Sequence, residues 1–152
     1  MKIVIRPMKF MDINQVMEIN QSSLPENYPK EFWTLKFHEG KTHSFVSTDA
    51  CTVIGYIFCD NNSIISFAIN EKYRGKSIGK CLMQNCLNTF IIPMTLHVRV
   101  TNEPALKLYR SLGFTEKEKL IDYYLNPIED AYLMEWNPCM KHTEMRKLNI
   151  SI

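Results

Sequence analysis

The sequence has no apolar stretch near the roughly 18 residues that a membrane-spanning helix needs. Its opening residues, MKIVIRPM, resemble a charged strand and lack the apolar core of a signal peptide. Internal repeats and low-complexity tracts are also absent. The formal net charge of +2 is too small to indicate nucleic acid or an acidic membrane as a partner. These absences predict a protein that binds neither nucleic acid nor a membrane.

Paired metal-ligating residues are missing as well. The chain has 5 cysteines but no CxxC, and no histidine lies at zinc-ligand spacing from a cysteine pair. We therefore expect no metal. Cys81 and Cys86 fall in a helical pattern, where they are expected to be buried small apolar residues. An odd number of scattered cysteines and no signal peptide predict a reducing, cytoplasmic setting.

The chain is long enough to bury a core without covalent staples. It has 152 residues, of which 45% are hydrophobic, and both values fit one compact domain. We expect the domain to span residues 1–137. A short C-terminal tail, residues 138–152, is polar and is expected to be loosely ordered.

Hydrophobic periodicity predicts an alternation of strands and helices. Strands are expected over residues 2–6, 44–48, 52–59, 63–70, 96–100, 114–125 and 130–136. Helices are expected over residues 13–23, 31–38, 77–90 and 105–111. Asp12 and Asn102 are candidate N-caps, and Gly113 is a candidate C-terminal cap. The order predicts an α/β fold of the mixed α+β kind, a mostly antiparallel sheet of about seven strands with a parallel central pair and helices on both faces.

A basic, glycine-containing loop leads into the helix expected over residues 77–90. It reads Arg74-Gly-Lys-Ser-Ile-Gly-Lys80 and follows an apolar strand. Unpaired main-chain N–H groups and the helix dipole favour an anion there, so we expect a phosphate or pyrophosphate site. The loop matches neither GxxxxGK[ST] nor GxGxxG. Taken alone, it is equally compatible with an ordinary basic helix start.

The same loop resembles the acyl-CoA-binding signature of the GNAT superfamily of N-acetyltransferases, Arg/Gln-x-x-Gly-x-Gly/Ala. It departs from that signature at Ser77, which stands where the family has its first glycine and is expected to enter positive φ only at a cost. The resemblance implies acetyl-CoA as cosubstrate. It assigns acetyl-CoA binding to Phe67, Ala68, Ile69, Arg74, Gly75, Lys76, Ser77, Ile78, Gly79, Lys80, Asn102 and Tyr109.

A second stretch is similar to the last strand–helix unit of this family. It reads LHVRVTNEPA over residues 96–105 and LYRSLGF over residues 108–114. In the family, an asparagine at the position of Asn102 contacts the pantetheine arm of CoA. A tyrosine at the position of Tyr109 is proposed to protonate the leaving thiolate. Without the surrounding motif, Tyr109 would be taken for a packed helix aromatic.

Two further segments resemble N-terminal acetyltransferases, of the RimI type and of the N-terminal acetyltransferase A catalytic-subunit type. Residues 23–28, SLPENY, are similar to a substrate loop, and residues 122–124 with 129–132 to a hairpin carrying two tyrosines. The similarity spans residues 1–136. It implies transfer of acetyl to the free α-amino group of a protein or peptide, with substrate-binding residues Leu24, Pro25, Glu26, Tyr28, His97, Tyr123 and Tyr124.

Two residues are candidate bases for direct attack of the amine within a ternary complex. Glu26 matches a glutamate that lines the peptide site in one group of relatives, and His97 occupies the position of a base in others. An α-amino group has a pKa of roughly 8, so a modest base is sufficient. Ordinary alternatives are a solvated loop carboxylate for Glu26 and a structural strand histidine for His97.

Other functions remain open at this point. The chain could acetylate a lysine side chain or a small-molecule amine, for which Glu129 and Asp130 are the only dense acidic feature near the hairpin. It could also be a non-catalytic acetyl-CoA-binding or interaction domain, a reading that Ser77 favours. An auxiliary or ribosome-associated subunit is a further candidate partner.

Overall fold

The computed structural model describes residues 1–39 and 43–138 of the protein. The chain forms two compact units, Met1–Thr89 and a second unit that begins at Phe90. The domain boundary expected after residue 137 stays a prediction, and residues 139–152 of the expected tail lie outside the described residues.

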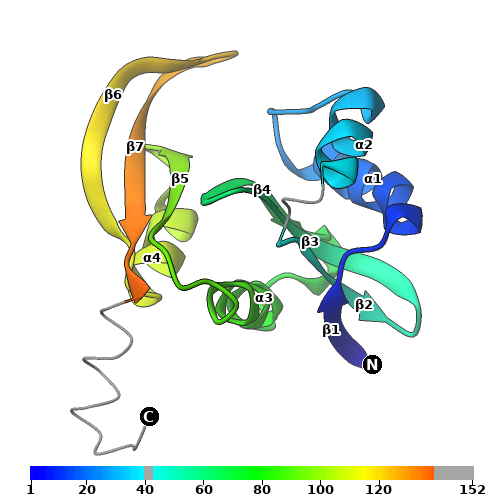
Figure 1. Ribbon diagram of the computed structural model, residues 1–152. Helices are drawn as coiled ribbons and strands as arrows, with labels where there is room; N and C mark the ends of the chain where they lie inside the picture. Colours follow the sequence, from blue (N-terminus) through cyan, green and yellow to red (C-terminus); the bar gives the residue numbers. More distant parts are fainter. Residues whose placement is uncertain (40–42, 139–152) are drawn as a thin grey trace, which may run out of the picture. The chain divides into compact units, whose positions relative to one another are not determined.

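Within residues 1–39 and 43–89, the first unit has four strands and three α-helices, which Figure 1 shows. Its strands are β1 (Ile3–Pro7), β2 (Phe45–Asp49), β3 (Thr52–Asp60) and β4 (Ser63–Ile69). Its helices are α1 (Ile13–Ser23), α2 (Lys30–His38) and α3 (Ile78–Leu87), with 3-10 turns at Phe10–Asp12 and Glu71–Tyr73. Each of these strands and helices lies within a few residues of its expected range.

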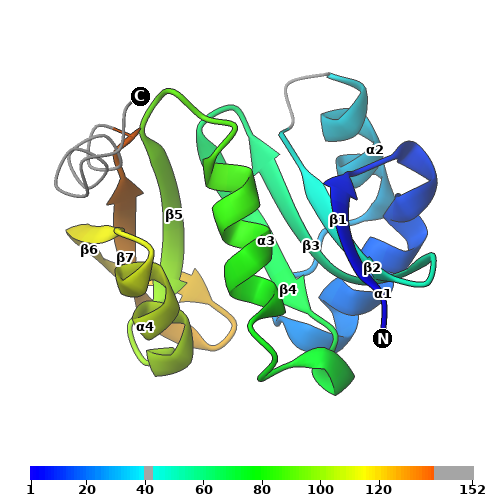
Figure 2. The same ribbon diagram turned by 90° about the horizontal axis from the view of Figure 1, so that it is seen from below.

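The four strands of this unit pair antiparallel in the order β1-β2-β3-β4. Helices α1 and α2 cover one face of these strands and α3 covers the other (Figures 1 and 2). Because both faces of β3 are covered, Val53–Cys59 are all buried. This explains why β3 reads as a continuous apolar run.

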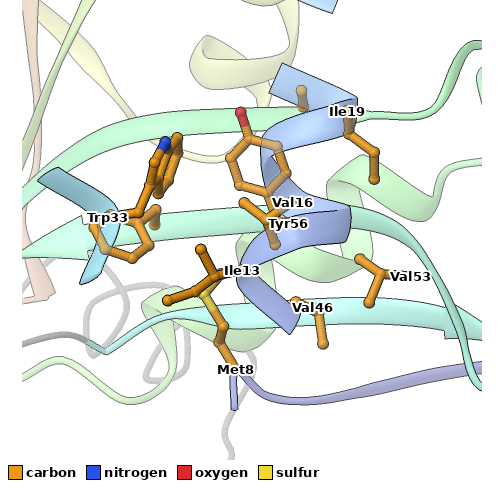
Figure 3. Packing of buried hydrophobic residues seen from close by; sticks show 10 residues of the cluster. Met8, Ile13, Val16, Ile19, Trp33, Val46, Val53 and Tyr56 are labelled. Atoms are coloured by element: carbon orange, nitrogen blue, oxygen red, sulfur yellow. The ribbon is translucent and has the colours of Figure 1, made fainter. Parts of the chain in front are cut away.

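The core on the α1 and α2 side is built around aromatic side chains (Figure 3). Trp33 from α2 is fully buried, and its ring centroid lies 5.9 Å from that of Tyr56 and 4.8 Å from that of Phe58, both on β3. Both ring pairs are edge-on, the favoured arrangement for aromatic groups. Val16 and Ile19 of α1 belong to the same cluster of buried side chains. Trp33 therefore joins α2 to the same strand that α1 covers.

Asp12 stands at the N-cap position of α1, as expected, but its side chain does not cap the helix. Asp12 makes no side-chain hydrogen bond to the start of α1. Its carboxylate instead accepts two hydrogen bonds from the Arg6 guanidinium, at 2.7 and 2.8 Å, and one from the Lys9 N–H at 2.7 Å. Asp12 is only 2% exposed. Two charge-assisted hydrogen bonds between a guanidinium and a buried carboxylate are stronger than one capping hydrogen bond at the surface. Asp12 therefore binds Arg6 and does not cap α1.

Asp12→Asn is expected to lower the free energy of unfolding by about 3 kcal/mol, because it leaves the Arg6 charge without its partner. Burial would raise the pKa of Asp12, but the Arg6 and Lys9 hydrogen bonds outweigh it and hold that pKa below 3.8. The stability that ionised Asp12 adds to the wild type is therefore fully present above pH 3.8, its pKa in the unfolded chain. This stability is lost as the pH falls through the lower pKa that Asp12 has in the folded protein.

Urea denaturation of both proteins between pH 2.5 and 7 measures this difference. Asp60→Asn, which breaks the more exposed pair with Lys36, is the control and should change stability by less than about 1 kcal/mol. Equal losses for the two variants at neutral pH would contradict the role given to Asp12.

The described part of the second unit, residues 90–138, contains three strands and one α-helix, which Figure 1 shows. They are β5 (Met94–Arg99), α4 (Glu103–Ser111), β6 (Thr115–Leu125) and β7 (Ile128–Trp136), and the strands pair antiparallel in the order β5-β7-β6. The Asn102 side chain accepts the Ala105 N–H at 3.3 Å, and Gly113 follows α4 with φ of 97°. Both expected caps of α4 are thus confirmed.

The described cysteines are all free thiols. Cys86 is buried as expected, but Cys81 is exposed, so its expected burial is wrong. Cys59 and Cys86 lie 3.5 Å apart, sulfur to sulfur. The neighbouring Cys86 thiol and burial raise the pKa of Cys59, so the Cys59 thiol stays protonated, and both buried side chains pack as apolar groups. None of the helices in the described part of the chain combines the length and apolar character needed to span a bilayer.

Candidate active site

The loop before α3 adopts the left-handed backbone that an anion-binding turn needs. Gly75 has φ of 76° and Ser77 has φ of 62°. Ser77 stands at the N-cap of α3, and its carbonyl accepts the N–H of Cys81 at 3.1 Å. The N–H groups of the first helical turn have no partner within the helix. Ser77 therefore takes the conformation of the glycine that the family signature expects at its position.

The charged side chains of this loop are at the surface. Lys72, Arg74, Lys76 and Lys80 are all exposed. The Arg74 Nε donates to the Ile69 carbonyl at 3.0 Å, which ties the loop to the end of β4. These four cations and the positive end of the α3 dipole together favour a multiply charged anion such as pyrophosphate.

Gly79 lets the start of α3 lie against β4. A Cβ at Gly79 would be 3.2 Å from the Phe67 ring, which is tighter than most Cβ contacts, and 3.4 Å from Ile69. The expected residues Phe67, Ile69 and Gly79 are therefore neighbours. Ala68 points to the opposite side, into the core with Val16, so only its main chain is available for the expected binding of acetyl-CoA.

Ser77→Gly is expected to raise the free energy of unfolding by about 1 kcal/mol, because glycine adopts positive φ without the steric cost that a Cβ brings. Chemical denaturation measures this. The matched control is Gly75→Ala. No atom lies within 4 Å of the Cβ that it adds, so its expected loss of about 1 kcal/mol reflects backbone strain alone. A Ser77→Gly protein no more stable than wild type would contradict the expected strain.

The expected substrate residues Leu24, Pro25, Glu26 and Tyr28 lie between α1 and α2. The Tyr28 ring stacks on Phe32 with ring centroids 4.5 Å apart. Its hydroxyl lies 3.5 Å from the Ile65 carbonyl on β4. This segment is thus packed against the first unit and has a defined shape.

In the second unit the structure brings His97 and Tyr123 together. Their rings are parallel within 6°, with centroids 4.5 Å apart. A bulge in β6 shifts the pairing register between Leu120 and Tyr124, and Asp122 within it has φ of 50°. Such bulges redirect side chains. Burial lowers the pKa of His97 below 6.5, so its imidazole is neutral, and able to accept a proton, at pH 7.

Tyr109 and Asn102 belong to the helix that follows β5. Desolvation raises the pKa of the Tyr109 phenol far above its ordinary value of 10, which keeps the hydroxyl protonated. Its ring lies 5.7 Å from that of Phe114. The Asn102 side chain caps α4, as described above, a structural role that sequence motifs alone do not separate from the expected contact with CoA.

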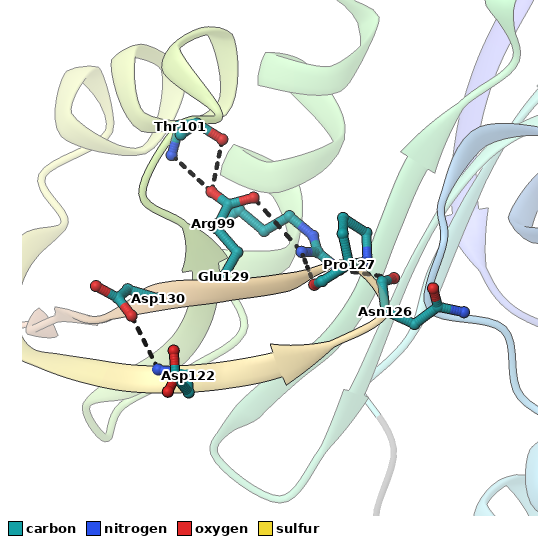
Figure 4. A network of polar contacts seen from close by, with 7 residues as sticks. All are labelled: Arg99, Thr101, Asp122, Asn126, Pro127, Glu129 and Asp130. Atoms are coloured by element: carbon teal, nitrogen blue, oxygen red, sulfur yellow. Dashed lines mark hydrogen bonds and ion pairs between the residues drawn. The ribbon is translucent and has the colours of Figure 1, made fainter.

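Sequence reasoning missed the polar network that joins Arg99, Glu129 and Thr101 (Figure 4). The Arg99 guanidinium lies over the Tyr124 ring, 4.1 Å from its centroid. Arg99 also donates to the Pro127 carbonyl at 3.0 Å and pairs with Glu129 at 3.4 Å. Glu129 in turn accepts hydrogen bonds from the N–H and hydroxyl of Thr101, at 3.0 and 2.5 Å. The sequence did contain a signal for Arg99. Side chains two positions apart on a strand point to the same face of the sheet, so Arg99 was expected on the face that carries His97.

The acidic feature near the hairpin is engaged within the chain. Glu129 is held by Thr101 and Arg99, and Asp130 accepts the Asp122 N–H at 2.8 Å (Figure 4). Among the described residues there is also no group of three or more His, Cys, Asp or Glu side chains placed to hold a metal ion. These carboxylates therefore offer little support for recognition of a polyamine.

A sequence profile of the acetyltransferase (GNAT) family matches residues 13–114. The chain belongs to this family. Its mixed α/β fold, with seven strands and four α-helices among residues 1–39 and 43–138, confirms the expected fold class. The match includes the Arg74–Lys80 loop and the β5–α4 segment, which carry the two motifs of the acetyltransferase signature.

Named relatives and a solved structure extend the comparison. The acetyltransferase is 34% identical over 151 residues to an N-alpha-acetyltransferase of Sulfurisphaera tokodaii, covering 86% of this chain and 90% of that one. It is 27% identical to the N-terminal acetyltransferase A complex catalytic subunit ard1 of Schizosaccharomyces pombe, covering 86% and 82%. The structure of Ard1 from Thermoplasma volcanium matches with a TM-score of 0.80 at 28% identity, covering 90% and 97%.

Proposed function

We propose that this acetyltransferase transfers the acetyl group of acetyl-CoA to the free α-amino group at the N-terminus of a protein or peptide. The observation that carries the proposal is the match to the Sulfurisphaera tokodaii N-alpha-acetyltransferase. A match that covers 86% of the chain must include residues of both units.

The loop before α3 fits the phosphate groups of CoA. Gly75 and Ser77 have positive φ, the first turn of α3 offers N–H groups, and exposed Lys76 and Lys80 add charge. The cosubstrate supplies the activated acetyl group as a thioester. Phe67, Ile69 and Gly79 form the adjoining surface of the first unit. Asn102 and Tyr109, in the second unit, are the proposed contacts for the remainder of the molecule.

The reaction requires the attacking amine to lose a proton and the leaving sulfur to gain one. His97 and Glu26 are the two candidates to accept the amine proton, directly or through a water. Because burial lowers the pKa of His97, its neutral form predominates at pH 7. The Tyr109 hydroxyl is proposed to donate a hydrogen bond to the leaving sulfur, which takes its proton ultimately from solvent. No covalent bond to the enzyme is needed, so positioning provides much of the catalysis.

The tyrosines of the second unit are proposed to contact the peptide. Tyr123 is 44% exposed although it stacks on His97, and Tyr124 is held by Arg99. Tyrosine combines apolar area with a hydroxyl and suits a peptide main chain. The auxiliary or ribosome-associated subunit stays a prediction. The Schizosaccharomyces pombe relative, named as a catalytic subunit of a complex, supports it.

Acetyl transfer to a panel of short peptides tests the proposed function. The panel varies the first two residues and includes an N-terminally blocked peptide with a lysine, and a polyamine. We expect transfer to free N-termini only. Transfer confined to lysine or polyamine would instead assign the protein to a different acetyltransferase activity. Binding of acetyl-CoA without transfer to any acceptor would favour a non-catalytic domain or a required partner.

A further inference from the structure

The segment Leu24–Tyr28 is held at two of its carbonyl groups by buried side chains. The Asn20 side-chain amide donates to the Glu26 carbonyl at 3.1 Å, and the Trp33 indole N–H donates to the Tyr28 carbonyl at 3.1 Å. Asn20 is 1% exposed and Trp33 is 0% exposed. A surface loop whose main chain is bound from the core has few alternative conformations, because each of them would leave a buried donor unpaired.

Asn20 continues this contact into the sheet. Its Nδ2 also lies 3.2 Å from the Tyr56 hydroxyl, which is 2.7 Å from the Ser66 Oγ. Since Nδ2 can only donate, the Tyr56 oxygen accepts from Asn20, and the Tyr56 and Ser66 hydroxyls are bonded to each other. The Ser66 Oγ is a second, longer acceptor for Asn20 Nδ2, at 3.5 Å. The result is a line of hydrogen bonds from β4 through β3 and α1 to the main chain of Glu26.

The groups in this line are buried and uncharged. Tyr56 is 0% exposed and Ser66 is 6% exposed. Burial raises the pKa of Tyr56 to about 12, so the phenol keeps its proton at neutral pH. With its amide oriented to match its neighbours, Asn27 donates to the Asn20 Oδ1 at 3.0 Å, so both ends of the Asn20 amide are bonded.

Stability alone is a poor reason for this arrangement. Polar groups in a core gain little net energy even when fully bonded, and apolar side chains of similar volume often do as well or better. What such a network adds is a defined geometry. Here its outer end is the main chain of Glu26, which lies in the segment expected to receive the first residue of the substrate.

We propose that Asn20, Tyr56 and Ser66 are positioning residues that fix the Leu24–Tyr28 segment and thereby set which first residue of a polypeptide the enzyme accepts. This inference rests on the proposed function and deepens it. A segment with fixed walls discriminates by rejecting side chains that do not fit, whereas a mobile one would adapt to them. The network acts on the acceptor side of the reaction and leaves the acetyl-CoA loop unaffected.

Tyr56→Phe tests the inference because it removes one hydroxyl and keeps the ring. Asn20 then loses its nearer hydroxyl acceptor and keeps the Glu26 carbonyl and the 3.5 Å contact with the Ser66 Oγ, while Ser66 loses its 2.7 Å partner. We expect the Michaelis constant for the preferred peptide to rise roughly fivefold, the equivalent of one lost hydrogen bond. Preference among first residues should fall by a similar factor, while the Michaelis constant for acetyl-CoA stays within about twofold. Hydrogen exchange at the amides of residues 24, 26 and 27 should become faster.

Two further variants distinguish an effect on the position of the segment from a general loss of stability. Val46→Ala shortens a fully buried side chain of the same core and should lower stability without changing the peptide preference. In Tyr56→Phe/Ser66→Ala both hydroxyls are gone, so part of the lost stability should return. The altered peptide preference should persist, since Asn20 still lacks its partner. All assays are run at a temperature at which circular dichroism shows each protein folded.

Unchanged peptide preference and unchanged loop exchange in Tyr56→Phe would overturn the inference, as would a peptide effect that disappears in the double variant. Failure of the proposed function would look different, because the wild-type enzyme itself would then not acetylate free N-termini. The exchange measurement needs no acceptor, so it tests the anchoring of the segment in either case.

Discussion

Tyr109→Phe is expected to lower kcat about 100-fold while the Michaelis constant for acetyl-CoA stays within about twofold. The variant keeps the ring that lies 5.7 Å from Phe114 and loses only the hydroxyl. The loss should appear in kcat because the negative charge on the leaving sulfur develops only in the transition state, and a donor aimed at that charge contributes only there. Steady-state kinetics with acetyl-CoA varied at saturating peptide measures both constants.

The nature of the donor also follows from its surroundings. Desolvation raises the pKa of Tyr109 well above 10, whereas an ordinary thiol has a pKa of roughly 8.5. Full proton transfer from this phenol to a thiolate would be uphill. We therefore expect Tyr109 to donate a hydrogen bond to the developing charge, with the proton supplied ultimately by solvent. Because the phenol stays protonated throughout this range, the loss of kcat in Tyr109→Phe should be nearly the same at every pH between 6 and 9.

Tyr132→Phe is the control, since it removes a hydroxyl from β7 of the same unit and should leave kcat nearly unchanged. Full activity of Tyr109→Phe would show that Tyr109 does not assist the leaving group. An equal rise of the Michaelis constant for acetyl-CoA with unchanged kcat would make Tyr109 a binding residue only.

Features set by neighbouring residues were predictable from the sequence. Asn102 caps α4 and Gly113 ends it, because both roles depend on main-chain groups only a few positions away. The apolar residues over 52–59 likewise predicted a strand, which is β3. Short-range physics determines these elements, and the family signature placed the acetyl-CoA loop between β4 and α3.

Contacts between distant residues were not predictable in the same way. Asp12 was expected to cap α1, but Arg6 on β1 offers it a stronger partner. Asn20 and Tyr56 are 36 positions apart and meet only when α1 packs on β3. Ser77 was expected to resist positive φ, yet it adopts that conformation in the turn before α3. In each case the folded surroundings outweigh a local preference.

His97→Gln is expected to lower kcat/KM for a peptide about 100-fold and to remove one limb of its pH profile. A base must be neutral to act. Because burial holds the pKa of His97 below 6.5, wild-type activity should lose this base only as pH falls below that value. The α-amino group of the substrate, with a pKa of roughly 8, produces a separate rise on the alkaline side. Profiles between pH 5 and 9 resolve the two.

Glu26→Gln distinguishes the two candidate bases. If His97 is the base, Glu26→Gln should keep the limb below pH 6.5 and lower kcat/KM by a smaller factor. Loss of that limb in Glu26→Gln but not in His97→Gln would assign the base to Glu26, and loss in both would indicate a shared relay. His38→Gln, which changes an exposed histidine at the end of α2, controls for the same substitution at a position outside the proposed site. A limb that survives in every variant would mean that the proton goes to solvent and that His97 serves to hold Tyr123 through their stacked rings.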